Sequence, residues 1–411
     1  MTENVVTEND DVLFDPFAPG FTDDPYPQYR QMREAGPVYQ HPLGFWLLTQ
    51  HAEVSDLLRS GLSVEDRNLG PSPMRDLREQ AGIDVDPRAG GLSMLDRDPP
   101  DHTRLRSLVS KVFTPRSIAA LEPEVTALVD EALNRIAEVG SVDLVEELAF
   151  PLPFAVISRM LGMPSIDHVR LRELTAQLVR SLEPVNDPAT LTGIAAADAE
   201  LSAVIGEVIA WKRDRPGDDL LTALIAAEHD GDVLSDEELV AQVVLLYVAG
   251  HETTVNLIAG GVLALLRQPD QLALLRARPE LAGAATEELL RYDSPVQLSR
   301  RITLEPHIIH GQVIPAGSFV IASLASANRD ERFWGADADR VILERPDARK
   351  HVSFGGGPHH CLGAALARLE ARIAFGRLVE RFDTLALDGE VEWNGRINLR
   401  GPARLPVSVS G

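Results

Sequence analysis

Cys361 is the single cysteine in a chain of 411 residues, and it stands in the stretch FGGGPHHCLG. Apolar residues recur behind it at Leu362, Leu366, Leu369 and Ile373, a spacing that predicts an amphipathic helix. The N–H groups and dipole of a helix N-terminus favour an anion, so we expect a lowered thiol pKa and a thiolate. A thiolate there suits a nucleophile, a redox sensor or a metal ligand, and a small buried apolar side chain is the plain alternative.

Other metal and nucleophile patterns fit the sequence less well. A single cysteine rules out zinc-ribbon and iron–sulfur patterns. The segment HETTV begins like a zinc-protease motif, but the position of its second histidine is occupied by Val255. A nucleophilic pair of Cys361 with His359 or His360 remains open on spacing, although adjacent side chains rarely face each other productively.

A second group of polar residues lies inside the most apolar part of the sequence. Ser235 and Glu238 form an S-x-x-E capping box, which predicts the start of a helix over 236–267. About 32 residues at a rise of roughly 1.5 Å give a helix of about 48 Å, long enough to cross the molecule. Its middle carries the turn AGHETT, and an unpaired polar group inside a core costs about 1–3 kcal/mol. We therefore expect the interior of the protein to use these groups.

Composition and charge narrow the function classes. Hydrophobic residues make up 45% and charged residues 25%, which is ordinary for a globular protein. The net charge of −23 argues against nucleic acid as the main partner. The acidic N-terminus resembles neither a secretory signal nor a membrane anchor, and the polar turn within Leu239–Leu266 favours a buried helix over a membrane span. We expect a soluble, cytoplasmic protein with no membrane partner and no disulfide bond.

Basic residues nevertheless gather at two places in this acidic chain. One interpretation is ordinary solvated helix faces, and the other is a surface that steers an acidic partner. The two groups are Arg104, Arg106, Lys111 and Arg116, and Arg345, Arg349, Lys350, Arg368 and Arg372.

The hydrophobic pattern predicts a mainly α protein with a minor β-sheet region, an α+β fold. Residues 1–11 are expected to form a disordered tail and 12–411 a single domain, since no linker divides them. A hairpin is expected at VYQ and FWLLTQ, a long loop with at most one helical turn over 69–100, and later strands at RRITL, HIIHGQVIPAGSFVIASL and LPVSV. The other predicted helices cover 27–35, 101–112, 115–138, 143–161, 166–182, 190–214, 217–229, 268–277 and 279–292.

Several motifs together resemble the cytochromes P450. FGGGPHHCLG is similar to that family's haem-binding pattern F-x-x-G-x-x-x-C-x-G, with Phe354, Gly357, Cys361 and Gly363 at the fixed positions. AGHETT resembles the oxygen-activation motif of the long central helix, EELLR the Glu-x-x-Arg pair, and DHTRLR a His-x-x-x-Arg pair. The opening DPYPQYRQMREAGPV is typical of soluble bacterial members, so the resemblance extends from about Asp15 to the C-terminus.

This resemblance implies the cytochrome P450 fold, a triangular helical prism with haem between the long central helix and the cysteine-loop helix. The implied cofactor is haem b, iron protoporphyrin IX, with Cys361 as its thiolate ligand, which favours O–O cleavage. The implied haem-binding residues are His102, Arg106, Arg301 and His359 at the propionates, Phe354, Gly355 and Gly363 on the sulfur side, and Ala249 and Gly250 on the distal side, where their small size leaves room for O2.

The resemblance also assigns proton delivery to the polar turn. Thr253 matches a family threonine whose hydroxyl helps to deliver protons during oxygen activation, and Glu252 matches the acid that relays them from solvent. The alternative is that Thr253 and Thr254 only satisfy carbonyl groups within the helix.

A structural triad is implied next to the cysteine loop. Glu288 and Arg291 lie three residues apart on one helical face, and Arg345 completes the triad in the family. The Phe-Asp dipeptide usual before this arginine is replaced by Val341–Ile342, so the sequence departs from the family pattern there.

The substrate pocket is implied only by position in the family. The helix near 170–185 and the loop 69–100 are expected to form its roof. The mostly aliphatic lining predicts a lipophilic substrate, such as a macrolide or polyketide, a terpenoid, a steroid or a fatty acid. The pocket residues are Met94, Leu95, Leu245, Val248, Val296 and Gln297.

The sequence shows no fused flavin or ferredoxin domain, so we expect O2, a separate ferredoxin and an NAD(P)H-dependent ferredoxin reductase as partners of a monomer. We hypothesise that an acidic ferredoxin docks on the basic groups, with Arg104, Arg349 and Arg372 as the residues to test. The alternatives are a peroxygenase driven by H2O2, an oxidative coupling enzyme and a non-catalytic haem-binding sensor.

Overall fold

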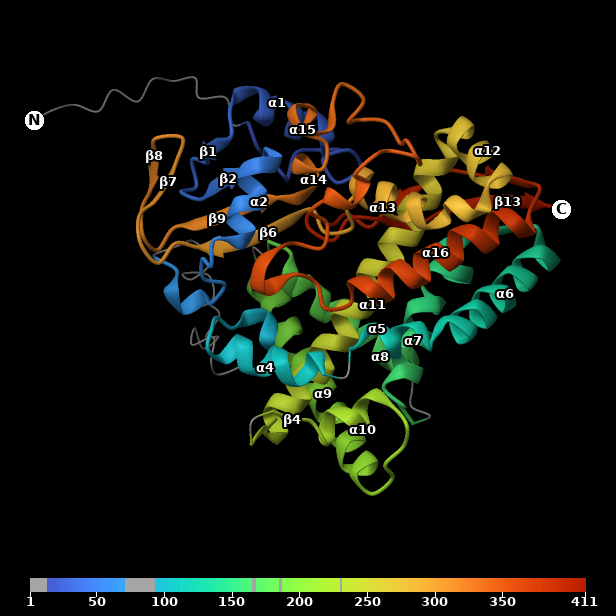
Figure 1. Cartoon of the computed structure of the whole chain (residues 1–411), viewed down its shortest axis with the longest axis horizontal. Helices are drawn as coiled ribbons and strands as arrows, with labels where there is room; N and C mark the ends of the chain where they lie inside the picture. The colour runs from blue at the N-terminus through green and yellow to red at the C-terminus, as the bar shows by residue number, and fades with distance from the viewer. Residues whose placement is uncertain (1–12, 71–92, 112, 165–167, 185–186, 230) are drawn as a thin grey trace, which may run out of the picture.

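The computed structural model describes residues 13–411 apart from 71–92, 112, 165–167, 185–186 and 230. The predicted N-terminal tail (1–11) and most of the predicted loop 69–100 lie outside the described residues. Helices make up most of the molecule, and strands β1, β2, β6 and β9, from both halves of the chain, form a sheet at one side of it (Figure 1). The prediction of a mainly α protein with a minor β-sheet region is confirmed.

The helices form where apolar residues recur at helical spacing behind a capping residue or an early proline. Proline occupies the first turn of several of them, where its missing N–H has no intrahelical partner to lose. The helices are α1 (Tyr26–Ala35), α2 (His51–Arg59), α4 (Asp101–Ser110), α5 (Pro115–Ala119), α6 (Glu122–Val139), α7 (Pro151–Met160), α8 (His168–Val179), α9 (Pro188–Arg213), α10 (Leu220–Ile225), α11 (Asp236–Leu266), α12 (Pro269–Ala277), α13 (Ala282–Tyr292), α14 (Leu324–Ala327), α15 (Glu331–Trp334) and α16 (Ala364–Arg381).

Helix α11 crosses the molecule and divides its apolar interior (Figure 1). The hydroxyl of Ser235 accepts the N–H of Glu238 at 3.1 Å, and the Glu238 carboxylate accepts the N–H of Ser235 at 2.9 Å, so the predicted capping box is present. The first half of α11 packs with α8, α9 and α10, and its second half packs with α6, α13 and α16. The polar turn 249–254 therefore lies where two apolar clusters meet.

The principal sheet joins the two ends of the chain. Its strand order is β1-β2-β9-β6, with β2 and β9 parallel and the other neighbours antiparallel. A second sheet has the order β10-β13-β3, and the predicted first hairpin is confirmed as β1–β2. The strands are β1 (Val38–Gln40), β2 (Trp46–Leu48), β3 (Ser141–Asp143), β4 (Glu228–His229), β5 (Asp232–Val233), β6 (Leu298–Ile302), β7 (His307–Ile309), β8 (Gln312–Ile314), β9 (Phe319–Ser323), β10 (Thr384–Leu387), β11 (Glu392–Trp393), β12 (Pro402–Arg404) and β13 (Pro406–Ser410).

Three predicted helices are wrong in extent. The predicted helix 115–138 is broken into α5 and α6 because Pro123 in the first turn of α6 cannot donate a backbone hydrogen bond. The predicted helix 143–161 begins instead as strand β3, which pairs with β13, and a π-turn (Val145–Ala149) precedes α7. The predicted helix 217–229 ends at Ile225, because a hairpin of β4 and β5 follows, with Gly231 at a φ of 83°.

Helix α2 was not among the predicted helices, and its N-terminal hydrogen bond explains why. The N–H of His51 donates to the Asp330 carboxylate at 2.9 Å, so a residue far along the chain satisfies the first turn of α2. No local capping signal is needed, and none is present in the sequence around residue 50.

Candidate functional site

Cys361 lies between the glycine loop and the first turn of α16. Its N–H donates to the carbonyl of Phe354 at 2.9 Å, Gly363 is the N-cap, and the helix begins at Ala364. The N–H groups of Gly363 and Ala364 act to lower the pKa of the Cys361 thiol. The predicted helix N-terminus behind Cys361 is therefore confirmed, and its two amides supply contacts that favour negative charge on sulfur.

The pKa of the Cys361 thiol is nevertheless raised. Burial is the largest cause, and it outweighs the lowering effects of the Gly363 and Ala364 N–H groups and of the Arg106 and Arg368 charges. Our expectation of a lowered thiol pKa is thus wrong for the protein groups alone, because it counted the helix dipole and not the loss of water. A bound metal cation reverses this balance, since a coordinating thiol is deprotonated outright.

The glycines before Cys361 are required by the backbone. Gly355 and Gly357 have φ values of 68° and 65°, in the left-handed region that other residues rarely adopt. A Cβ at Gly357 would also lie 2.5 Å from the carbonyl oxygen of Leu58 in α2. Conformation and close packing against α2 therefore both fix the shape of this loop.

The polar turn of α11 and the cysteine loop each present a residue that is accessible to solvent. Cys361 is accessible although protein surrounds it, and Ala249 is exposed in the middle of α11. Leu362, next to the cysteine, packs against the same apolar cluster as Leu245 and Val248 of α11. The thiol and the turn predicted to activate oxygen are thus brought to one region of the fold.

Within this turn, the two threonine hydroxyls bond to the helix itself. Thr253 Oγ1 donates to the carbonyl of Ala249 at 3.0 Å, and Thr254 Oγ1 donates to the carbonyl of Gly250 at 3.4 Å. These contacts are the ones that the alternative interpretation of the threonines requires.

Glu252 and His251 are the remaining polar side chains of the turn, and both contact residues outside α11. The Glu252 carboxylate forms an ion pair with Arg396, and the two side chains are 14% and 20% exposed. His251 lies edge-on to the rings of Phe150 and Phe154, with centroid distances of 4.5 and 5.6 Å. Burial, and then the charges of neighbouring arginines, lower the pKa of His251 to about 3, so this imidazole is neutral.

Four predicted haem-binding residues form a basic cluster. His102 and Arg106 come from α4, Arg301 from β6, and His359 from the cysteine loop. The His102 and His359 rings lie 4.2 Å apart, and the buried Nε2 of His102 has no hydrogen-bond partner among the described residues. Arg301 is 5% exposed and donates to the Ser299 hydroxyl at 3.0 Å.

The charge of Asp98 acts to raise the pKa of His102 and of Arg301, but burial has the larger, opposite effect on both groups. Burial, and then the charges of His102, Arg301 and Arg106, lower the pKa of His359 to about 3. Burial lowers the pKa of Arg301 to about 10, although Asp98 opposes the shift. The buried guanidinium of Arg301, with Arg106 and two neutral imidazoles in the same cluster, suits an anionic group that accepts charge-assisted hydrogen bonds. The cluster beside an accessible thiol therefore fits a haem, whose two propionates are anionic and whose iron accepts a thiolate.

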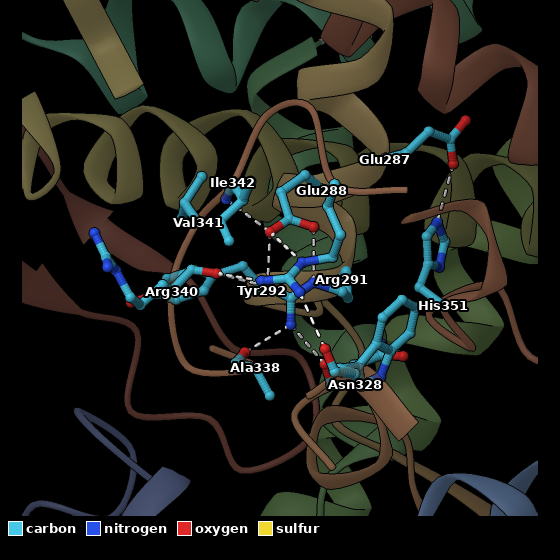
Figure 2. A network of polar contacts seen from close by, with 12 residues as sticks. Glu287, Glu288, Arg291, Tyr292, Asn328, Ala338, Arg340, Val341, Ile342 and His351 are labelled. Carbon is cyan, nitrogen blue, oxygen red and sulfur yellow. Dashed lines mark hydrogen bonds and ion pairs between the residues drawn. The ribbon is translucent and has the colours of Figure 1, made fainter. Parts of the chain in front are cut away.

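The predicted structural triad is present, and Figure 2 shows two of its members, Glu288 and Arg291. The guanidinium of Arg291 donates to both oxygens of Glu288 at 2.7 and 2.8 Å, and both side chains are 0% exposed. Arg345 donates to the same carboxylate at 3.1 Å. The departure from the family pattern at Val341–Ile342 does not disturb the triad, because the backbone N–H of Ile342 also donates to Glu288, at 2.9 Å.

The other contacts of Arg291 tie α13 to the segment before the cysteine loop. Its guanidinium donates to the carbonyl oxygens of Asn328, Ala338 and Arg340 at 2.8, 2.7 and 2.8 Å (Figure 2). The triad thereby connects α13 with the chain that leads to residue 351.

The predicted pocket residues divide into two groups. The first group is accessible: Leu245, Val248 and Val296 are partly exposed, and Leu95 is 42% exposed. The second group is buried and includes Met94, whose N–H donates to the side chain of Gln242. The prediction for Gln297 is wrong in this conformation. The residue is 0% exposed and its side-chain amide donates to the carbonyl of Ser294 at 2.6 Å, so it is unable to contact a ligand.

Some residues of the two predicted basic groups form ion pairs or are buried, and others are exposed. Arg104 forms ion pairs with Asp232 and Glu238, so its predicted place in a free basic surface is wrong. Arg345 is buried in the triad, and Arg372 pairs with Glu122 at 2.9 Å. Arg116 is exposed, and the Arg349 side chain is 84% exposed.

Sequence reasoning missed Arg396, the partner of Glu252, and a buried group formed by Glu287 and His351. Glu287 adjoins the Glu-x-x-Arg pair and His351 opens the cysteine stretch, but no spacing rule shows that they meet. It also missed Glu370 in α16. Burial raises the pKa of Glu370 to about 8, and its Oε2 has no partner among the described residues.

Helix α11 is the one described helix whose length and hydropathy suit a membrane span. Of its most apolar window, 61% is buried inside the protein. Both of its halves pack into apolar clusters, which is the environment of a core helix.

Comparisons with known proteins agree with this geometry. Residues 196–398 match the family model described as Cytochrome P450. The chain is 43% identical to Cytochrome P450 107B1 of Saccharopolyspora erythraea over 95% of this chain and 96% of that protein. It is 41% identical to the vitamin D(3) 25-hydroxylase of Pseudonocardia autotrophica over 96% of each. The crystal structure of the myxobacterial cytochrome P450 CYP267B1 in complex with myristic acid is similar with a TM-score of 0.87, 36% identity and coverage of 96% of this chain and 99% of that one.

The chain belongs to the cytochrome P450 family. It is a cytochrome P450 monooxygenase of the soluble bacterial type, and the family fold implies a haem-thiolate cofactor. Bacterial members of the family work with redox partner proteins and a substrate.

Proposed function

We propose that this monooxygenase hydroxylates a lipophilic small molecule, using haem b ligated by Cys361. The observation that carries the proposal is the meeting of an accessible thiol, two N–H groups that act to lower its pKa, and a basic cluster in which the buried Nε2 of His102 has no hydrogen-bond partner among the described residues. We also propose that residues 12–411 form a single domain.

The proximal residues hold the cofactor in this proposal. The N–H groups of Gly363 and Ala364 stabilise the thiolate of Cys361, and Phe354 packs on the sulfur side, next to Gly355. When bound, a thiolate-ligated haem supplies the activation of O2 for insertion of one oxygen atom into a C–H bond. The propionate-binding residues are His102, Arg106, Arg301 and His359.

The distal residues supply space and protons. Ala249 and Gly250 are small and leave room for O2 beside α11. The Thr253 hydroxyl donates its hydrogen to a carbonyl of its own helix. Its oxygen can therefore still accept a hydrogen bond from a proton donor in the pocket. In this proposal Glu252, partly exposed beside Arg396, takes protons from solvent and passes them toward Thr253.

The proposed substrate is lipophilic. Leu245, Val248, Val296 and Leu95 offer aliphatic surface with few polar groups to orient a ligand. A relative that hydroxylates vitamin D3 and a similar structure in complex with myristic acid support this class. Secondary metabolites such as macrolides or other polyketides, terpenoids, steroids and fatty acids all belong to it.

The proposed electron donor is an acidic ferredoxin, reduced by an NAD(P)H-dependent reductase, in the cytoplasm. Its docking surface includes the exposed cations Arg116 and Arg349, with Lys350 beside them at 57% exposure, and does not include Arg104. We propose that the protein acts as a monomer. Reversal of the Arg349 charge is expected to slow reduction and weaken its dependence on ionic strength.

The first test is whether Cys361 ligates the haem iron. The reduced protein with carbon monoxide is expected to give the red-shifted absorption band typical of thiolate ligation, and C361S is expected to lose it. A365S, a serine substitution at an exposed position of the same helix, serves as the control and should keep the band. A band that survives in C361S, or is absent from the native protein, contradicts the proposal.

Turnover then separates this proposal from its rivals. A panel of lipophilic compounds is screened for the high-spin shift of the haem spectrum, and products are analysed with a ferredoxin system and with H2O2 alone. Product formation with the ferredoxin system supports the monooxygenase. Product with peroxide alone identifies a peroxygenase, dimeric products identify coupling, and binding without product identifies a sensor.

A further inference from the structure

Glu287 and Glu288 are neighbours in α13, but their carboxylates belong to different networks (Figure 2). Glu288 is directed at the structural triad, whereas Glu287 is directed at His351 and α16. Glu287 is only 4% exposed. A buried carboxylate next to the cysteine loop, and outside the triad, requires compensating groups of its own.

Two groups compensate Glu287 directly. Arg368 Nε donates to Oε1 at 2.8 Å and its Nη2 donates to Oε2 at 3.2 Å, which is a bidentate pair. His351 Nε2 lies 3.1 Å from Oε2. Because His351 Nδ1 accepts the N–H of Ser353 at 3.2 Å, the ring proton is on Nε2 and is donated to Glu287.

His351 therefore contributes a hydrogen bond and not a charge. Burial lowers the pKa of His351, although Glu287 opposes the shift, and the imidazole is neutral. The negative charge of Glu287 is balanced mainly by the Arg368 guanidinium. Arg349 is the next cation, with its Nε 3.6 Å from Glu287, but its side chain is 84% exposed and solvent screens it.

Arg368 connects this carboxylate to the cysteine loop. Its guanidinium carbon lies 4.5 Å from the centroid of the Phe354 ring, a cation–π contact. The carbonyl of Phe354 accepts the N–H of Cys361 at 2.9 Å. A salt-bridged arginine, held by Glu287, thus lies directly behind the loop that presents the sulfur.

We propose that Glu287 is a positioning residue that holds Arg368 against Phe354, and that this partly buried pair sets the reduction potential of the enzyme through the net charge behind Cys361. The inference rests on the proposed ligation of haem by Cys361. Arg368 is 33% exposed, but its partner carboxylate is only 5% exposed and its guanidinium contacts Phe354, so solvent screens this pair less than it screens Arg349.

Removing one or the other charge of this pair is expected to shift the reduction potential in opposite directions. E287Q removes the negative charge and leaves Arg368 unbalanced, which favours the electron-rich reduced state and raises the potential. R368Q leaves Glu287 unbalanced and lowers the potential. The double variant E287Q/R368Q restores neutrality and returns the potential toward the native value, and R368K keeps the charge and stays close to it.

The experiment is a spectroelectrochemical titration of the holoenzyme of each variant, with the carbon monoxide spectrum as a check of thiolate ligation. The two single variants are each expected to shift the one-electron equilibrium about tenfold, equivalent to about 59 mV, in opposite directions. R372Q, on the same helix and 41% exposed, and E280Q, 68% exposed, are the matched controls and should shift it far less.

The outcomes separate this inference from the function on which it rests. Loss of the thiolate band in the native protein overturns the proposed function itself. An intact band with both single variants shifted in the same direction, or with neither shifted beyond R372Q, overturns the inference alone. If the role of Glu287 is purely structural, E287Q and R368Q lose thermal stability equally and their potentials do not shift in opposite directions. The double variant E287Q/R368Q tests this even if one of the single variants binds haem poorly.

Discussion

The carboxylate of Glu252 is ion-paired with the guanidinium of Arg396, whereas the hydroxyl of its neighbour Thr253 donates to the carbonyl of Ala249. The acid and the alcohol of the polar turn therefore have separate partners in this conformation. Arg396 comes from the segment between β11 and β12, 144 residues away in the sequence. The position of Glu252, the proposed proton relay, thus depends on a part of the chain outside α11.

Replacing Arg396 tests this dependence. R396Q is expected to lower product formation about tenfold and to divert electrons to H2O2, because Glu252 loses the group that positions it. R396K should restore part of the loss by keeping the charge. The ratio of product to NAD(P)H consumed measures the effect. The control is R404Q, which removes an exposed arginine of β12 that pairs with Glu392 of β11. It should keep the native ratio of product to NAD(P)H consumed.

Glu183 holds the segment that carries Arg396. Its carboxylate accepts the N–H groups of Ile397, Asn398 and Leu399 at 2.8, 2.9 and 2.9 Å. E183Q is expected to cost about 1–3 kcal/mol of local stability, because an amide is unable to accept all three bonds equally well. Faster hydrogen exchange at these amides measures the loss, and E390Q, at an exposed position, is the control. Unchanged exchange would show that the clamp is unimportant.

The buried triad gives a prediction of stability. E288Q leaves Arg291 charged and buried at 0% exposure, and this is expected to lower the free energy of unfolding by about 3–5 kcal/mol. Denaturant unfolding of the holoenzyme measures it. R278Q removes an arginine that is 44% exposed and paired with Glu344, and should cost less than about 1 kcal/mol. Equal losses in the two variants would contradict the argument from burial.

Glu370 gives a prediction of pH dependence. Burial raises its pKa from 4.5 to about 8, so the folded protein holds this proton more tightly than the unfolded chain. Its contribution to stability is therefore fully favourable below pH 4.5 and is lost as the pH rises toward 8, by up to about 1.4 kcal/mol per pH unit. E370Q should be more stable than the native protein at pH 8 and lose that advantage at pH 5. Parallel pH profiles of thermal unfolding would contradict this prediction.

The sequence reveals those features that depend on residues close together in the chain. The motif around Cys361 shows where a helix N-terminus presents a thiol, and Ser235 with Glu238 marks the start of α11. A capping box or a glycine loop acts within one or two turns, so its residue types and spacing contain the necessary information.

Tertiary structure decides features that depend on burial and on distant partners. Arg104 reads as part of a basic surface, but the fold pairs it with Asp232 and Glu238. The helix dipole at Cys361 is visible in the sequence, while the burial that raises its thiol pKa is not. Glu252 meets Arg396 only when α11 packs against the segment between β11 and β12, and Glu287 meets Arg368 only when α13 packs against α16. Desolvation and long-range pairing depend on the whole fold, and for that reason spacing along the chain does not determine them.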